Sequence, residues 1–182
     1  MDYVEGSIRM ITKQEKREEN ILDIITNAIE SIAIYKGMVS LIDSHKDNSV
    51  FITLLNNCAM IAVIRICNIF GTDSENNHWK KLFEDHNSFR NTIILPVFDN
   101  FEEYEKYNHM LKNFRNDFVV HFIEDSNVVM PYFEPTLKLL TATLKYILDK
   151  FKYNVDKEPI KNAEYFYEKI YYKTVNMFKA KD

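Results

Sequence analysis

The chain has 182 residues and a formal net charge of −4, with 23 basic and 27 acidic side chains. This length is typical of one domain with a proper core, and the acidic balance argues against a protein that coats nucleic acid through bulk electrostatics. With only three glycines and four prolines, the composition favours long helices over the frequent turns of an all-β protein. We therefore expect one all-α domain over residues 1–182.

The N-terminal residues 1–19 are charged and lack the apolar stretch of a signal peptide. No uncharged run approaches the roughly 20 residues that a membrane-spanning helix needs, so we expect a soluble, cytoplasmic protein without a membrane partner. Cys58 and Cys67 share one apolar segment; on a helix they lie about 13 Å apart, too far for a disulfide. No Cys/His spacing indicates a metal site, and we expect no cofactor.

The first predicted helix starts at the capping-box pattern Thr12-Lys-Gln-Glu15 and runs to about Ile42. Glycine costs a helix about 1 kcal/mol relative to alanine, so Gly37 could kink this helix or end it early. Apolar residues recur along it with the 3.6-residue helical period: Ile21, Ile24, Ile25, Ala28, Ile29, Ile32 and Ala33.

The second predicted helix spans Phe51 to Phe70, with Asn48 or Ser49 as its N-cap and Gly71 as its stop. It is apolar on nearly every face, which is typical of the central helix of a bundle. Arg65 and Asn68, three residues apart on one face, are the exceptions, and a cation there must be paired or hydrated.

Residues 72–100 form an irregular connector, with a short helix expected near Trp79 and a second helix start at Asn87-Ser88. Asp99-Asn100 then cap a third long helix with two glutamates in its first turn. A fourth helix is expected after Pro131 or Pro135, and a fifth from about Pro159. Five main helices with short connectors make an up-and-down helical bundle.

The end of the third helix carries the residues best suited to chemistry, Arg115, Asn116 and His121. A guanidinium offers a permanent, bidentate charge for phosphate, and an imidazole can exchange protons near neutral pH. On a straight α-helix, Arg115 and His121 would differ by about 120° and about 9 Å along the axis. Either the helix bends between them, or a second copy completes the site across a two-fold axis. The aromatic residues Phe114, Phe118 and Phe122 could form that dimer surface.

This Arg-Asn-x4-His pattern resembles the HEPN superfamily, whose small helical members include many metal-independent ribonucleases. The resemblance covers about 60 residues, including 62–67, 79–82 and 107–122, and is of the abortive-infection type. It implies a homodimeric endoribonuclease of toxin or anti-phage defence type acting on RNA, with tRNA as one candidate, and controlled by an antitoxin or other regulatory partner. Some HEPN toxins carry a modified tyrosine two residues after the histidine; Ile123 occupies that position here.

In the implied mechanism, His121 takes the proton of a ribose 2′-hydroxyl or protonates the leaving 5′-oxygen. Arg115 stabilises the charge that develops on the phosphorane, Asn116 orients the imidazole or contacts phosphate, and the product is a 2′,3′-cyclic phosphate. Arg65 and Lys112 are candidate phosphate contacts, although Arg65 could equally bridge to Asp99 or Glu103. The alternative function is a non-catalytic HEPN-like module that binds a nucleotide or a partner protein.

Overall fold

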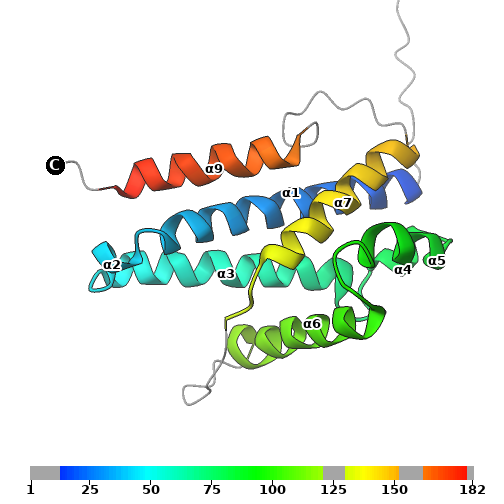
Figure 1. Ribbon diagram of the computed structural model, residues 1–182, viewed down its shortest axis with the longest axis horizontal. Helices are drawn as coiled ribbons and strands as arrows, with labels where there is room; N and C mark the ends of the chain where they lie inside the picture. The colour runs from blue at the N-terminus through cyan, green and yellow to red at the C-terminus, as the bar shows by residue number, and fades with distance from the viewer. Residues whose placement is uncertain (1–12, 121–129, 152–161, 180–182) are drawn as a thin grey trace, which may run out of the picture.

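The computed structural model describes residues 13–120, 130–151 and 162–179, and these ranges contain helices and no β-strand. Five longer helices alternate in direction along the chain (Figure 1): α1 (Lys13–Val39), α3 (Ser49–Phe70), α6 (Phe101–Phe114), α7 (Glu134–Phe151) and α9 (Ala163–Phe178). The predicted all-α, up-and-down bundle is therefore confirmed.

Helix α1 is the central helix of the bundle and packs against α3, α7 and α9. The predicted apolar stripe forms its buried face, whereas the capping box at Thr12 lies outside the described residues. The helix ends at Val39, and after a turn the short helix α2 (Ile42–His45) follows. Gly37 lies within α1 against α9, where a Cβ would meet the Thr174 Cβ at 3.0 Å.

Helix α3 begins and ends as predicted. The Asn48 side chain accepts a hydrogen bond from the Phe51 backbone N–H at 3.1 Å, and a Cβ on Gly71 would lie 2.3 Å from the Cys67 carbonyl oxygen. The predicted central position of this helix is wrong. One face packs on α1 and α6, but apolar side chains on the opposite side, such as Ile61 and Leu54, are exposed.

Within the described part of the chain, α3 is the one helix whose length and composition would allow it to cross a membrane. The core helix of a soluble protein meets the same criteria, and α3 buries nine side chains inside the bundle. The fold is consistent with a soluble protein.

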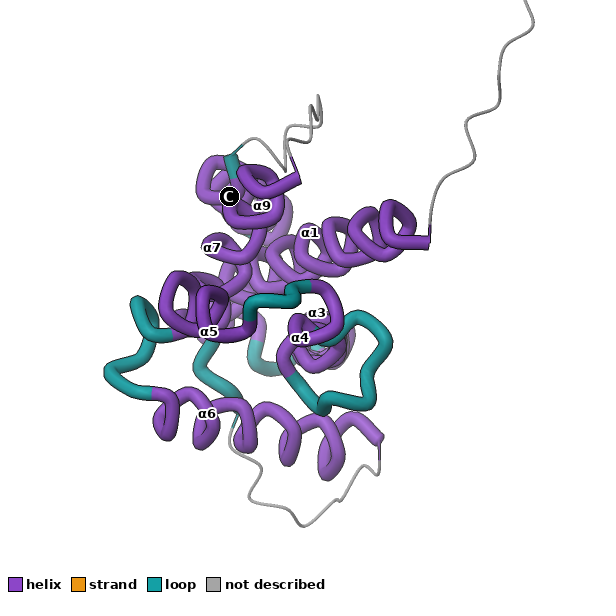
Figure 2. The backbone as a smooth tube through the Cα atoms, turned by 90° about the vertical axis from the view of Figure 1, so that its right-hand side faces the viewer, coloured by secondary structure: helices purple, strands orange, loops and turns teal. Residues whose placement is uncertain are grey.

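The connector between α3 and α6 contains the short helices α4 (Trp79–Leu82) and α5 (His86–Phe89) and a π-helical turn, η1 (Arg90–Ile94). Helix α5 starts one residue before the expected Asn87, because the Asp85 side chain caps it by accepting from the Ser88 N–H at 2.9 Å. The aromatic rings of Trp79 and Phe89 stack at 4.7 Å in the core. In Figure 2, α4 and α5 lie between α6 on one side and α9 on the other.

Helix α6 is capped by the Asn100 side chain, which accepts from the Glu103 N–H at 3.0 Å as predicted. After Phe114 the helix changes from α to π geometry, forming η2 (Arg115–Val120). Helix α7 starts at Glu134, which forms an ion pair with Lys36 of α1. Helix α9 starts at Ala163 after an Asn162 cap, and its expected start at Pro159 lies outside the described residues.

Candidate functional site

Arg115 stands where α6 gives way to η2, and two hydrogen bonds fix the direction of its guanidinium. Its Nη1 donates to the Glu75 carboxylate at 3.3 Å, and its Nε donates to the Asn116 side-chain oxygen at 3.2 Å. Glu75 belongs to the loop between α3 and α4, so this ion pair ties the end of α6 to that loop. The side chain of Arg115 is 22% exposed, and its guanidinium is therefore held in place while remaining within reach of solvent.

The structure describes the positions of some predicted site residues and not of others. Asn116 is exposed and receives its hydrogen bond from Arg115, so here it orients the arginine. His121 follows η2 and lies outside the described residues. Lys112 precedes Arg115 by three residues and therefore lies on the same side of the helix, one turn away. Arg115, Asn116 and Lys112 are the predicted residues that the structure brings together.

Arg65 does not belong to this group in the described structure. It is half-buried on α3 and makes no ion pair with any described residue, so the expected bridge to Asp99 or Glu103 is absent. Arg65 and Cys67, two residues apart, leave the helix about 200° apart. The charge of Arg115 acts on the pKa of the Cys67 thiol, so Cys67 lies on the side of α3 that faces Arg115. Arg65 therefore points to another side of the helix. Its role as a phosphate contact stays a prediction.

Cys67 shows how the charges gather at the C-terminal end of α3. Burial raises the pKa of its thiol to about 11, Arg115 and Lys112 act to lower it, and Glu75 raises it. All three charged side chains therefore lie near one point of α3. The thiol itself is fully buried and protonated at neutral pH, which makes it part of the core and unsuited to act as a nucleophile.

The predicted aromatic dimer surface is wrong at its first residue. Phe114 is 3% exposed and packs in the main core with Leu111 and Tyr104. The side chains of Phe118 and Phe122 are outside the description. A row of aromatic residues along a helix can face either a core or an interface, and at Phe114 it faces the core.

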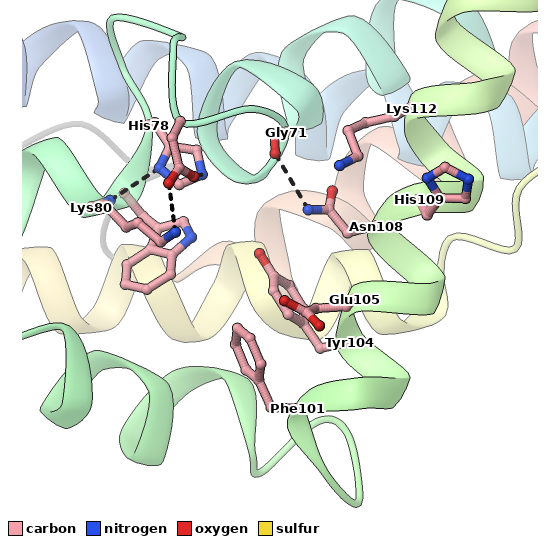
Figure 3. A pocket seen from close by; sticks show the side chains of 11 residues that line it. Gly71, His78, Lys80, Phe101, Tyr104, Glu105, Asn108, His109 and Lys112 are labelled. Carbon is pink, nitrogen blue, oxygen red and sulfur yellow. Dashed lines mark hydrogen bonds and ion pairs between the residues drawn. The ribbon is translucent and has the colours of Figure 1, made fainter.

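A pocket of about 340 Å³ lies between α6 and the segment 71–80, next to the Arg115 cluster. Figure 3 shows its lining: α6 contributes one face of the helix, and the facing wall comes from the end of α3 and the start of α4. Its aromatic and polar lining includes Phe101, Tyr104, Asn108, Lys112, Trp79 and Lys80. This pocket was not predictable from the sequence, because its two walls lie about 30 residues apart in the chain.

The charges on the facing wall are organised around Asp73. Its carboxylate accepts a hydrogen bond from the Lys80 ammonium at 2.7 Å, and this bond is the main cause of the lowered pKa of Asp73. His78 Nε2 lies 3.5 Å from the other carboxylate oxygen. Burial lowers the pKa of His78 to about 4, more than Asp73 raises it, so the imidazole is neutral at neutral pH.

Asn108 is the least expected polar residue of the pocket. It occupies a buried position of α6, 8% exposed, where its Nδ2 donates to the Gly71 carbonyl oxygen at 3.4 Å. Its Oδ1 is screened from bulk solvent and receives no hydrogen bond from the described residues. The sequence did contain a signal for it, since Asn108 lies four residues after Tyr104 and three before Leu111, both buried.

No group of three or more His, Cys, Asp or Glu side chains in the described ranges is placed to hold a metal ion. No family model matches the chain, and no curated protein or solved structure is significantly similar to it. The site's own residues therefore carry the functional argument.

Proposed function

We propose that this chain is a HEPN-like endoribonuclease that cuts RNA by attack of the ribose 2′-hydroxyl and leaves a 2′,3′-cyclic phosphate. The observation that supports it best is the fixed, solvent-accessible guanidinium of Arg115 at the first residue of the Arg-Asn-x4-His sequence. A guanidinium oriented in this way can stabilise the negative charge that develops on the phosphorane. Its biological role would be that of a toxin or anti-phage effector acting on cellular RNA, with tRNA as a candidate substrate and an antitoxin as a candidate partner.

The Arg115–Glu75 pair is compatible with phosphate binding. Both side chains are partly exposed, at 22% and 32%, so solvent can reach the pair. An RNA phosphate can therefore compete with Glu75 for the guanidinium, while Asn116 continues to hold its Nε side. In this proposal Glu75 orients Arg115 in the free protein, and the phosphate takes its place in the complex.

The π-helical turn η2 adds a second supporting feature. It occupies Arg115–Val120, the stretch that leads from the arginine to His121. In a π-helix the hydrogen bonds run from residue i to i+5, and such turns occur often at functional sites. The segment 115–120 is therefore not a straight α-helix, and the change from α to π geometry alters the angle between Arg115 and the residues that follow it. His121 would serve as the acid–base residue.

The proposed enzyme is a homodimer, and its contact would be a row of side chains on α3 that we call the α3 seam: Val50, Leu54, Asn57, Ile61 and Ile64. They are spaced 4, 3, 4 and 3 residues apart, which is the heptad spacing of helices that pair with another helix. All five are exposed in the bundle. Exposed apolar rows of this kind mark interaction surfaces, so the seam favours pairing with a second copy.

The test is incubation of purified protein with total tRNA and a defined RNA in EDTA. We expect the wild type to cut, and His121→Ala to cut at least about 100-fold more slowly, because general acid–base catalysis contributes that much or more. Arg115→Ala should lose activity as well. His45→Ala is the matched control, since His45 lies in α2, at the end of α3 away from Arg115. Equal cleavage by wild type and His121→Ala would refute the proposal.

A second candidate is the non-catalytic module that docks on a partner protein, which the α3 seam also favours. It predicts no cleavage by any variant. A purely structural His121 would then reveal itself through a loss of about 1–3 kcal/mol in the free energy of unfolding of His121→Ala. Thermal denaturation of the same four proteins separates the two candidates.

A further inference from the structure

A second hollow of the surface, which we call the α7–α9 groove, runs between α7 and the first turns of α9. Two adjoining pockets of about 330 and 190 Å³ form it, and Thr141, Ala163 and Glu164 line both of them. Helices α9 and α6 lie on opposite sides of α1 and α3 (Figure 1). A molecule in the α7–α9 groove would therefore leave the Arg115 cluster accessible.

The floor of this groove is apolar. Four residues of α7 line it at spacings of 4, 3 and 4 residues, which places them on one face of the helix over about 16 Å: Leu137, Thr141, Leu144 and Leu148. On α9, the small side chain of Ala163 leaves space at the groove, and the Tyr167 ring is half-buried beside it. Leu137 and Leu148 are also half-buried, so apolar surface remains within reach of solvent.

Carboxylates dominate the rim of the groove. Glu164 and Glu168 stand one turn apart on α9, Asp149 lies on α7, and all three are exposed. None of them forms an ion pair with another described side chain. Lys145 is the basic residue among the described lining, so three uncommitted carboxylates face one ammonium. The rim is therefore complementary to a positively charged occupant.

We propose that the α7–α9 groove is a docking site for a basic amphipathic helix of a partner protein. An apolar groove about three turns long accepts the i, i+4 and i+7 anchors of such a helix, and the acidic rim selects lysine or arginine beside those anchors. The proposal goes beyond the ribonuclease and does not depend on it, since the groove contains none of the residues assigned to RNA chemistry. A partner held there would bring the protein to a target or an assembly without covering Arg115.

The probe for this site is a fluorescein-labelled model peptide of about 20 residues, with leucines on one helical face and lysines on the other. One comparison peptide keeps the leucine face and has glutamates in place of the lysines. A second has the leucine–lysine composition in an order without helical period. Fluorescence anisotropy is measured with nucleic-acid-free protein at about 0.15 M salt. We expect saturable binding of the leucine–lysine helix, and binding of both comparison peptides that is weaker by about tenfold or more.

A groove-filling variant locates the peptide. Thr141→Trp places a large side chain where the two pockets meet, and it should weaken binding of the leucine–lysine helix by about tenfold. Lys138→Trp is the matched control, because Lys138 is exposed on the same helix outside the groove. It should leave binding unchanged.

A charge variant tests the rim without altering the floor. Glu164→Gln combined with Glu168→Gln should weaken binding by about tenfold, because it removes two carboxylates that face the lysines of the peptide. Glu19→Gln combined with Asp23→Asn is the control, since it removes two exposed carboxylates at the same spacing on α1. All four substituted positions are exposed, so this pair of variants tests the groove even if Thr141→Trp folds poorly.

Each result decides the proposal independently of RNA cleavage. Weaker binding by Thr141→Trp and by the Glu164/Glu168 variant, with both controls unchanged, would support the docking site. Equal binding by wild type and these variants would place the peptide elsewhere and overturn it. The proposal would also be overturned if the leucine–glutamate helix or the peptide without helical period bound as tightly, or if the leucine–lysine helix showed no saturable binding.

Discussion

Lowering the pH from 7.5 to 5.5 should destabilise the wild-type fold more than the fold of a His78→Asn variant. His78 is 2% exposed and caps α4, its Nδ1 accepting from the Lys80 backbone N–H at 3.3 Å. Asparagine is a good N-cap residue that can accept the same hydrogen bond and does not titrate. The substitution therefore removes the proton-binding group and keeps the cap.

The sign follows from burial, which lowers the pKa of His78 from 6.5 to about 4. Between these two values the unfolded chain binds a proton that the folded chain excludes. The stability that His78 contributes is thus complete above pH 6.5 and is lost as the pH falls toward 4. Integrating this difference gives a loss of at most about 1.3 kcal/mol between pH 7.5 and 5.5.

Urea denaturation of both proteins at the two pH values measures this difference. With an m-value of about 2 kcal/mol/M, the extra loss in the wild type corresponds to a midpoint shift of about 0.6 M. Titration of the other carboxylates and histidines is common to both proteins and cancels in the comparison. Equal midpoint shifts in wild type and variant would refute a buried neutral His78.

Two further predictions concern packing. Gly37→Leu should lower the free energy of unfolding by about 2–3 kcal/mol, because any Cβ there already meets Thr174 at 3.0 Å. Asn27→Leu, at an exposed position of the same helix, is the control. Equal urea midpoints for the two variants would contradict a tight α1–α9 contact. Ile61→Glu should dissociate the proposed dimer, as measured by sedimentation equilibrium, and leave the thermal stability of the monomer nearly unchanged. Leu95→Glu, at an exposed position outside the α3 seam, is the control and should not dissociate the dimer. A monomeric wild type would show that the α3 seam is not a homodimer contact.

The parts of the fold that local sequence determines were predictable. Asn48 and Asn100 each cap the helix that follows, and the stripe on α1 is the buried face. A cap depends on a side chain and a backbone N–H three residues away, and a stripe depends on the helical period. Neither requires knowledge of which element packs against the helix. The boundaries of α3 follow for the same reason.

Placement of α3 was not predictable in this way. Because this helix is apolar on nearly every face, periodicity does not show which face a neighbour covers. The heptad spacing from Val50 to Ile64 is present in the sequence, but it does not stand out there because apolar residues also occupy the other faces of the helix. The pocket was missed for a related reason: the sequence places Asn108 on the apolar side of α6, but it does not show that the segment 71–80 folds against that side. The π turn at Arg115 involves a change of hydrogen-bond register that no residue pattern encodes.

The direction in which two α3 helices pair would decide how near two Arg115 residues come to each other. Arg115 lies near Cys67, ten residues beyond Asn57 at the middle of the α3 seam. In an antiparallel pair centred on Asn57, the two Cys67 positions would lie about 30 Å apart along the axis, so each copy would hold a separate site. In a parallel pair the two C-terminal ends of α3 lie side by side, with each Arg115 on the α6 side of its own α3 helix and outside the α3 seam. Parallel pairing is therefore the arrangement that brings the two Arg115 sites nearest, and in it Asn57 faces Asn57 of the second copy. A buried asparagine pair of this kind fixes register and pairing in parallel helices at some cost in stability, which gives this polar residue a reason to interrupt an otherwise apolar seam.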